Sequence, residues 1–87
     1  MTFVWTDHAL DRCDERHVRD GRVEDVIETE GAFREVNDEA GGYQLPLLNR
    51  DGEKCEVVYV HPDDDETVAV IVTVHRVRER PRRSRPS

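Results

Sequence analysis

The amino-acid sequence predicts one α+β domain in which two helices are followed by four strands. Between His8 and Glu30, apolar residues recur with the three-and-four spacing of helices, whereas after Gly31 they come in short runs separated by turn sequences. A chain of 87 residues has enough apolar surface for only one core. We therefore expect a single domain over residues 1–77, followed by a disordered, arginine-rich tail over residues 78–87.

The first part of the chain predicts a helical hairpin. Residues 2–5 (TFVW) are typical of a short strand, which would be an extra N-terminal strand. Thr6 or Asp7 can cap a helix that runs to about His17, because a short polar side chain satisfies the free N–H groups of the first turn. A second helix is expected over residues 20–30, with Asp20 as its cap candidate and Gly31 after its end.

The second part predicts an antiparallel meander. Asp51-Gly52 is a strong two-residue hairpin signal. Pro46 cannot donate a hydrogen bond to a neighbouring strand, so its strand is expected at an edge or with a bulge. The expected strands cover residues 32–36, 43–49, 54–61 and 67–77.

The last of these strands is expected to be central. Strict alternation would place Val68, Val70, Val72 and Val74 on one face and Ala69, Ile71, Thr73 and His75 on the other. Both faces are apolar through the middle of the strand, which favours a position covered by the helix pair on one side.

His8, Arg12 and Arg16 are spaced by four residues, which places them on one helical face. On a helical projection, Ala9, Leu10, Cys13 and His17 form the buried stripe, and the three basic residues border it. Such a border position suits groups that line a cleft. The same spacing also suits a solvated face on which Arg12 and Arg16 pair with Asp11 or Glu15, and both interpretations stay open.

The segment HALDRCDERHVRDGRVEDVIE, together with the later Ile71-Val72-Thr73-Val74, resembles a domain-of-unknown-function family of small RelE-like proteins. The family signature is His-Ala-x-x-Arg, then Glu-Arg, then a second helix ending in Val-Ile. The resemblance implies two helices packed on a curved, four-stranded antiparallel sheet. It also implies metal-independent RNA cleavage, as in the ribonuclease toxins of toxin–antitoxin pairs. The matching residues are His8, Ala9, Arg12, Glu15, Arg16, Val18, Val23, Val26 and Ile27.

Cleavage of RNA without a metal requires a base for the 2′-hydroxyl, cations for the phosphate and an acid for the leaving oxygen. His8 is the candidate base, because the positive end of the helix dipole favours its neutral form. Arg12 and Arg16 are the candidate phosphate ligands. His75 is the candidate acid, and Arg76 and Arg78 are candidate RNA-binding residues. The chain departs here from RelE-like toxins, which often carry a late tyrosine or a further arginine, so activity can be altered or lost.

The charge of the chain is unevenly distributed. The net charge is −7, but residues 76–87 contain six arginines and one glutamate and carry +5, which leaves −12 on residues 1–75. An acidic body repels nucleic acid and a basic tail attracts it. The alternative to a nuclease is therefore a non-catalytic protein- or RNA-binding module of the same fold.

Further expectations concern partners, metals and compartment. The expected partners are RNA, with or without the ribosome, a cognate antitoxin protein and, as a homodimer, a second copy of the chain. No cofactor is expected, and no metal, because Cys13, His17 and Cys55 fall short of four ligands in a recognised spacing. Two cysteines on separate elements favour buried free thiols in a reducing, cytoplasmic setting. The longest apolar run, residues 68–74, is too short to span a bilayer, so no membrane association is expected.

Overall fold

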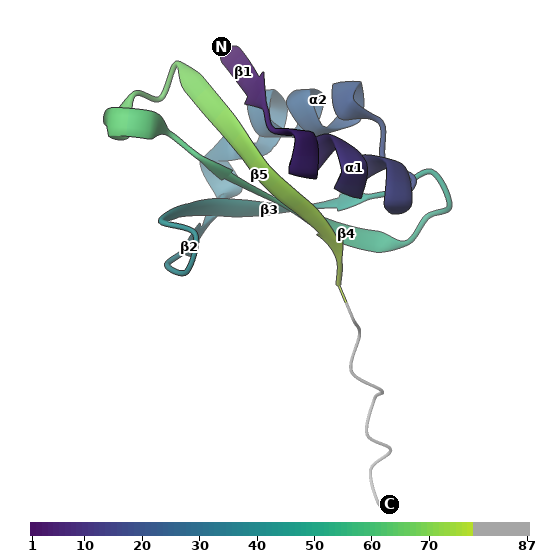
Figure 1. Cartoon of the computed structure of the whole chain (residues 1–87). Coiled ribbons are helices and arrows are strands. Elements are labelled where there is room, and N and C mark those ends of the chain that lie inside the picture. The colour runs from purple at the N-terminus through teal and green to yellow at the C-terminus, as the bar shows by residue number, and fades with distance from the viewer. Residues whose placement is uncertain (78–87) are drawn as a thin grey trace, which may run out of the picture.

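A computed structural model describes residues 1–77 and has an α+β architecture, with two helices on one face of a five-stranded sheet (Figure 1). The predicted tail over residues 78–87 lies outside the described residues. The elements in chain order are β1 (Thr2–Trp5), α1 (Asp7–Glu15), α2 (Asp20–Glu30), the short helix η1 (Gly31–Phe33), β2 (Glu35–Asn37), β3 (Gly42–Leu48), β4 (Lys54–Val60), the short helix η2 (Pro62–Asp64) and β5 (Val68–Arg76).

The sheet is mixed, with the strand order β1-β5-β4-β3-β2. Strands β2 to β5 form the expected antiparallel meander, which confirms the α+β class. The expected sheet of four antiparallel strands needs one correction, because β1 is a fifth strand and pairs in parallel with β5, from Thr2 opposite Val68 to Trp5 opposite Ile71. The meander begins with β2 at one edge of the sheet and ends with β5, which pairs with β4 on one side only. The other side of β5 is therefore free to pair with β1.

Helix α1 is shorter than predicted, because the chain leaves it in a Schellman motif. Thr6 caps its start by accepting a hydrogen bond from the Ala9 N–H at 3.0 Å. At its end, the Val18 N–H donates to the Cys13 carbonyl at 2.9 Å and His17 adopts a left-handed conformation with φ of 60°. The predictions that Leu10 and His17 belong to the buried stripe are therefore wrong, since both are exposed, whereas Ala9 and Cys13 are buried as predicted.

The second helix runs over Asp20–Glu30 as predicted, but its cap and the strand after it differ. Arg19 occupies the cap position without a side-chain hydrogen bond, and Asp20 instead accepts from the Gly21 N–H at 2.7 Å. Gly31 follows the end of α2 but does not begin a turn, because it is the first residue of η1. The strand expected over residues 32–36 is consequently displaced to Glu35–Asn37.

Strand β5 does not alternate strictly. Val58 of β4 pairs with Thr73 and Tyr59 pairs with Ile71, so Val72 has no partner on β4. This extra residue shifts the alternation, and Val74 joins Ala69 and Ile71 in the core on the helix side. The prediction that Val74 shares a face with Val68, Val70 and Val72 is wrong for this reason. Thr73 and His75 consequently face away from the helices.

The core lies between the helix pair and one face of the sheet. The expectation of an edge strand holds only locally at Pro46: β3 lies between β4 and β2, but β2 pairs only with Gly42 to Gln44 and leaves β3 with a free edge beside the proline. Among the described residues, no helix is long and apolar enough to cross a membrane. The buried core residues are Ala9, Cys13, Val18, Val23, Val26, Ile27, Leu45, Leu47, Cys55, Val57, Tyr59, Ala69, Ile71 and Val74.

Candidate functional site

His8 lies in the first turn of α1, exposed, beside the part of β5 that extends past the end of β1. Its Nε2 atom is 3.3 Å from the hydroxyl oxygen of Thr73. The histidine therefore reaches the edge of the sheet, as the border position on the helix predicted.

Arg12 and Arg16 follow His8 along the chain, but they differ in their surroundings. Arg12 forms an ion pair with Glu15 at 2.5 Å, and both side chains are about half exposed. Arg16 is the residue that caps the end of α1, and its Nε atom is buried without a hydrogen-bond partner. Arg12 therefore follows the alternative of a solvated face, on which it pairs with Glu15, and neither arginine lines a hollow of the described residues.

His75 is turned away from His8. Its Nε2 atom lies 3.0 Å from Glu56 of β4, which neighbours β5 on the side opposite to β1 and α1. Arg76 donates to Glu53 at 3.0 Å. Arg78 lies outside the described residues. The structure therefore brings His8 to one edge of β5 and directs His75 across its other edge.

A row of polar side chains crosses the sheet face that carries no helix among the described residues. Asn37 donates to Gln44 at 2.9 Å, and Gln44 donates to Glu56 at 3.2 Å. Glu56 completes the row with His75. The four residues come from β2, β3, β4 and β5 in turn. Within residues 1–77, each carboxylate oxygen of Glu56 has one partner, and the contact with Glu56 orients the imidazole of His75. The sequence analysis named only His75 of this row, because cross-strand neighbours depend on register.

This row borders a hollow of about 480 Å³, which we call the open-face hollow. Val58 lines it and is only 3% exposed, although it does not belong to the core under the helices. Thr73 also lines the hollow and contacts His8, so His8 lies at its rim. The lining residues are Asn37, Glu39, Ala40, Gln44, Val58, Val72, Thr73 and His75.

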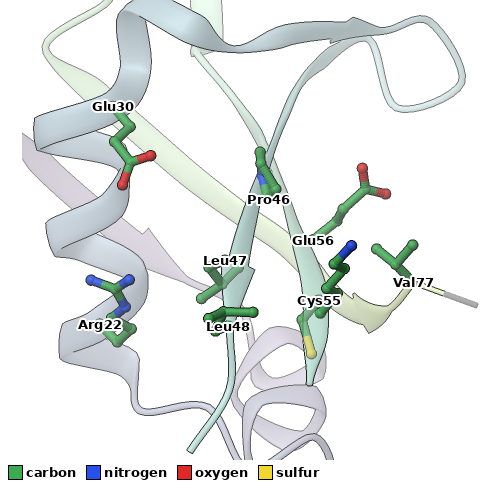
Figure 2. Close-up of a pocket in the computed structure, with 9 residues that line it drawn as sticks. Arg22, Glu30, Pro46, Leu47, Leu48, Cys55, Glu56 and Val77 are labelled. Atoms are coloured by element: carbon green, nitrogen blue, oxygen red, sulfur yellow. The ribbon is translucent and has the colours of Figure 1, made fainter. Parts of the chain in front are cut away.

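A second hollow, of about 450 Å³, follows the free edge of β3. Figure 2 shows Arg22 and Glu30 of α2 on one side of β3, with Cys55 and Glu56 of β4 on the other. Pro46 lies in the middle of this edge and has no N–H to offer to an added strand. The hollow carries both signs of charge, so its lining does not indicate one class of ligand.

An aromatic cluster surrounds His61 at the other end of the sheet, and no spacing in the sequence indicated it. The ring of His61 lies 5.5 Å from the Tyr43 ring and 5.4 Å from the Tyr59 ring, and its Nδ1 atom is 2.7 Å from the Val68 carbonyl oxygen. The guanidinium of Arg34 stacks over Tyr43 at 4.3 Å. With Tyr59 almost fully buried, the cluster closes one end of the core.

The two cysteines are free and buried, in agreement with the sequence analysis. Burial is the largest cause that raises the pKa of Cys13 to about 11, and nearby Asp20 and Cys55 raise it further. Burial also raises the pKa of Cys55. Both thiols are therefore protonated at neutral pH, which suits packing better than nucleophilic chemistry.

His17 cannot join Cys13 in a ligand pair, because it leaves the helix and its Nδ1 atom lies 2.7 Å from Asp51. Within residues 1–77, no group of three or more histidine, cysteine or acidic residues is placed to hold a metal ion.

Comparison with known proteins adds no relative. No family model matches the chain, and no curated protein or solved structure shows significant similarity to it. The resemblance to RelE-like proteins therefore stays a prediction.

Proposed function

We propose that this chain is a non-catalytic protein-binding module built on a RelE-like arrangement of two helices and a curved sheet. One observation carries the proposal. Three of the side chains expected to act on RNA, Arg12, His75 and Arg76, contact carboxylates of the chain itself: Glu15, Glu56 and Glu53.

These contacts matter because the affinity of proteins for RNA comes largely from cations that replace counterions around phosphates. A cation that already contacts a carboxylate contributes less to the potential that a phosphate meets. The local pairing adds to the net charge of −12 over residues 1–75, which repels a polyanion. The same negative charge attracts a protein partner with basic groups.

The first test is a cleavage and binding assay with the whole chain and a labelled single-stranded RNA. We expect intact RNA after prolonged incubation. We also expect the affinity and its salt dependence to be the same for the chain and for an Arg12→Gln/Arg16→Gln variant, since these arginines then bind no phosphate. The matched control is Arg22→Gln/Arg50→Gln, which removes two exposed arginines elsewhere in the domain. A salt slope that becomes shallower only in the first variant would contradict the proposal.

The second candidate function is a toxin-type endoribonuclease that cleaves RNA without a metal and is held in check by an antitoxin. The observation that favours it is Thr73, which contacts His8 and also lines the open-face hollow with His75. In this function, His8 is the base, Arg12 and Arg16 hold phosphate, and His75, oriented by Glu56, is the acid.

Single substitutions test this second function. His8→Ala and His75→Ala should each lower the cleavage rate by a factor of at least about 100, the range typical of lost acid–base catalysis. His61→Ala is the control, because His61 lies in the aromatic cluster and not in the hollow. Growth arrest on expression that disappears in the His8 variant would support the nuclease. Equal RNA stability with all three variants would exclude it.

A further inference from the structure

We infer that the open-face hollow receives an extended, arginine-bearing segment of a protein partner. This inference rests on the proposed function and names its surface and the chemistry of its partner. It depends on three properties of the hollow: its floor, its charge and its length.

The floor of the hollow is apolar, although no described helix covers this face of the sheet. Val58 is almost fully buried there, and Val72 and Ala40 contribute further apolar surface. A concave apolar floor with a few polar groups around it is the usual form of a recognition site. The aliphatic stem of a long side chain can cover such a floor while its polar head reaches the rim.

The charge of the hollow favours a cation. Glu39 lines it, and Glu56 lies in the polar row beside it, where each oxygen accepts one hydrogen bond from the described residues. A carboxylate has about four acceptor positions, so Glu56 can accept further donors. Glu35 and Asp38 are exposed on and directly after β2, next to the hollow. Among residues 1–77 the lining contains neither lysine nor arginine, and its one basic side chain, His75, contacts a single oxygen of Glu56.

Arginine suits this site better than lysine. Its planar head carries five N–H groups and can donate to two acceptors at once. The carboxylate of Glu39, in the turn after β2, and that of Glu56, on β4 beside the hollow, can each accept two N–H groups of one guanidinium. A lysine head is a point charge and lacks the planar, two-donor fit to a carboxylate.

The hollow is long enough for several residues of a partner. Its lining residues come from β2, β3, β4 and β5, so it crosses three spacings between strands. At about 4.8 Å per spacing, this distance is about 14 Å, which an extended chain covers with about four residues. A segment of that length can place one arginine at Glu39 and another near Glu56.

The probe for this inference is a fluorescein-labelled hexapeptide of alternating arginine and alanine, titrated against the whole chain and followed by anisotropy. We expect Glu39→Gln to weaken binding about tenfold, as a lost charge-assisted hydrogen bond would. Ala40→Arg should abolish binding, because it places a guanidinium in the hollow. Glu28→Gln, on the exposed face of α2, is the matched control for charge and should change the affinity less than twofold. The lysine version of the peptide should bind more weakly.

Three outcomes would overturn the inference. Equal weakening by Glu39→Gln and Glu28→Gln would show that the peptide responds to net charge only. Binding that survives Ala40→Arg would place the partner elsewhere, while the proposed protein-binding function stands. Tighter peptide binding by an Arg82→Gln/Arg83→Gln variant would show that residues of the chain itself occupy the hollow. RNA cleavage in the assay described above would instead contradict the proposed function, so the two failures are distinguishable.

Discussion

The side-chain amide of Asn49 donates to the main-chain carbonyl of Arg16 at 2.8 Å and joins the end of β3 to the end of α1. Asn49 is almost fully buried and uses the rest of its amide within the following turn. It donates to Glu53 and accepts from the N–H groups of Asp51 and Glu53. One residue therefore fixes both the exit of the helix and the turn between β3 and β4.

Asn49→Ala should lower the free energy of unfolding by about 3 kcal/mol, because it leaves several buried groups without partners. The measurement is urea denaturation followed by far-UV circular dichroism. Asn37→Ala is the control, since Asn37 also makes two side-chain hydrogen bonds but is partly exposed, and it should cost about 1 kcal/mol. Equal losses in the two variants would show that Asn49 does not connect α1 to the turn.

His17 should control the pKa of the Asp51 carboxyl. The hydrogen bond from His17 is the largest cause that lowers this pKa, and the charges of His17, Arg50 and Arg76 also lower it. His17→Ala should therefore raise the pKa of Asp51 toward its ordinary value, as measured from the carboxyl carbon shift in an NMR titration. Asp65 is the internal control, because its lowered pKa comes mainly from Thr67 and should not move.

The same pair should influence stability in acid. A carboxyl with a lowered pKa in the folded state contributes stability above its ordinary pKa, and this contribution is lost as the pH falls through the lowered value. The difference in stability between the chain and an Asp51→Asn variant should therefore shrink below about pH 3.8, the ordinary value of the group. A difference that grows in acid would contradict this assignment.

Gly42→Ala should destabilise the fold by about 2 kcal/mol or more, as overpacking of a close backbone contact does. A Cβ atom at this position would lie 2.2 Å from the carbonyl oxygen of Tyr59. Gly21→Ala is the matched control in α2, where a Cβ atom meets nothing within 4 Å. It should leave stability unchanged or raise it by up to about 1 kcal/mol, since alanine is the better helix former. Thermal unfolding of both variants measures these changes in stability. A Gly42→Ala variant as stable as the unsubstituted chain would show that β3 can move away from β4.

The thiols should be almost inert in the folded chain. Burial raises the pKa of Cys13 to about 11 and also raises that of Cys55, so a thiol reagent such as DTNB should react slowly at pH 8 and rapidly in urea. Because the folded state holds the Cys13 proton more tightly than the unfolded state, stability should decline as the pH rises from about 9 to about 11. Rapid native reaction of either thiol would indicate that the core opens.

The sequence alone predicted the α+β class, both helices and the antiparallel strands, because these depend on local periodicity and turn residues. It could not predict the place of β1. The pattern TFVW indicates an extended segment but not its neighbour, and the parallel pairing with β5 depends on how α1 returns the chain across the sheet.

Two further errors, at Val74 and at His17, have local causes with distant effects. Alternation in β5 predicted the wrong face for Val74, because the extra residue Val72 becomes visible only when β4 is paired. Helical periodicity wrongly placed His17 in the core. The helix ends with a left-handed residue, a position that glycine usually marks in a sequence, but here this residue is His17, which contacts Asp51.

The candidate site was predicted in part. The sequence identified His8 and His75, but the partners that orient them, Thr73 and Glu56, lie on neighbouring elements and depend on register. No spacing in the sequence marks Glu39 as a candidate site residue. Only the three-dimensional arrangement places Glu39 at the rim of a hollow.

The parallel pairing of β1 with β5 has a consequence for the order of folding. Thr2 pairs with Val68, and every other strand of the sheet lies between these two residues along the chain. Contacts so distant along the chain carry a large loop-closure entropy and slow the folding reaction. During synthesis, Phe3 and Trp5 therefore have no strand partner until β5 has left the ribosome. In that interval, a chaperone that recognises short apolar segments could bind them.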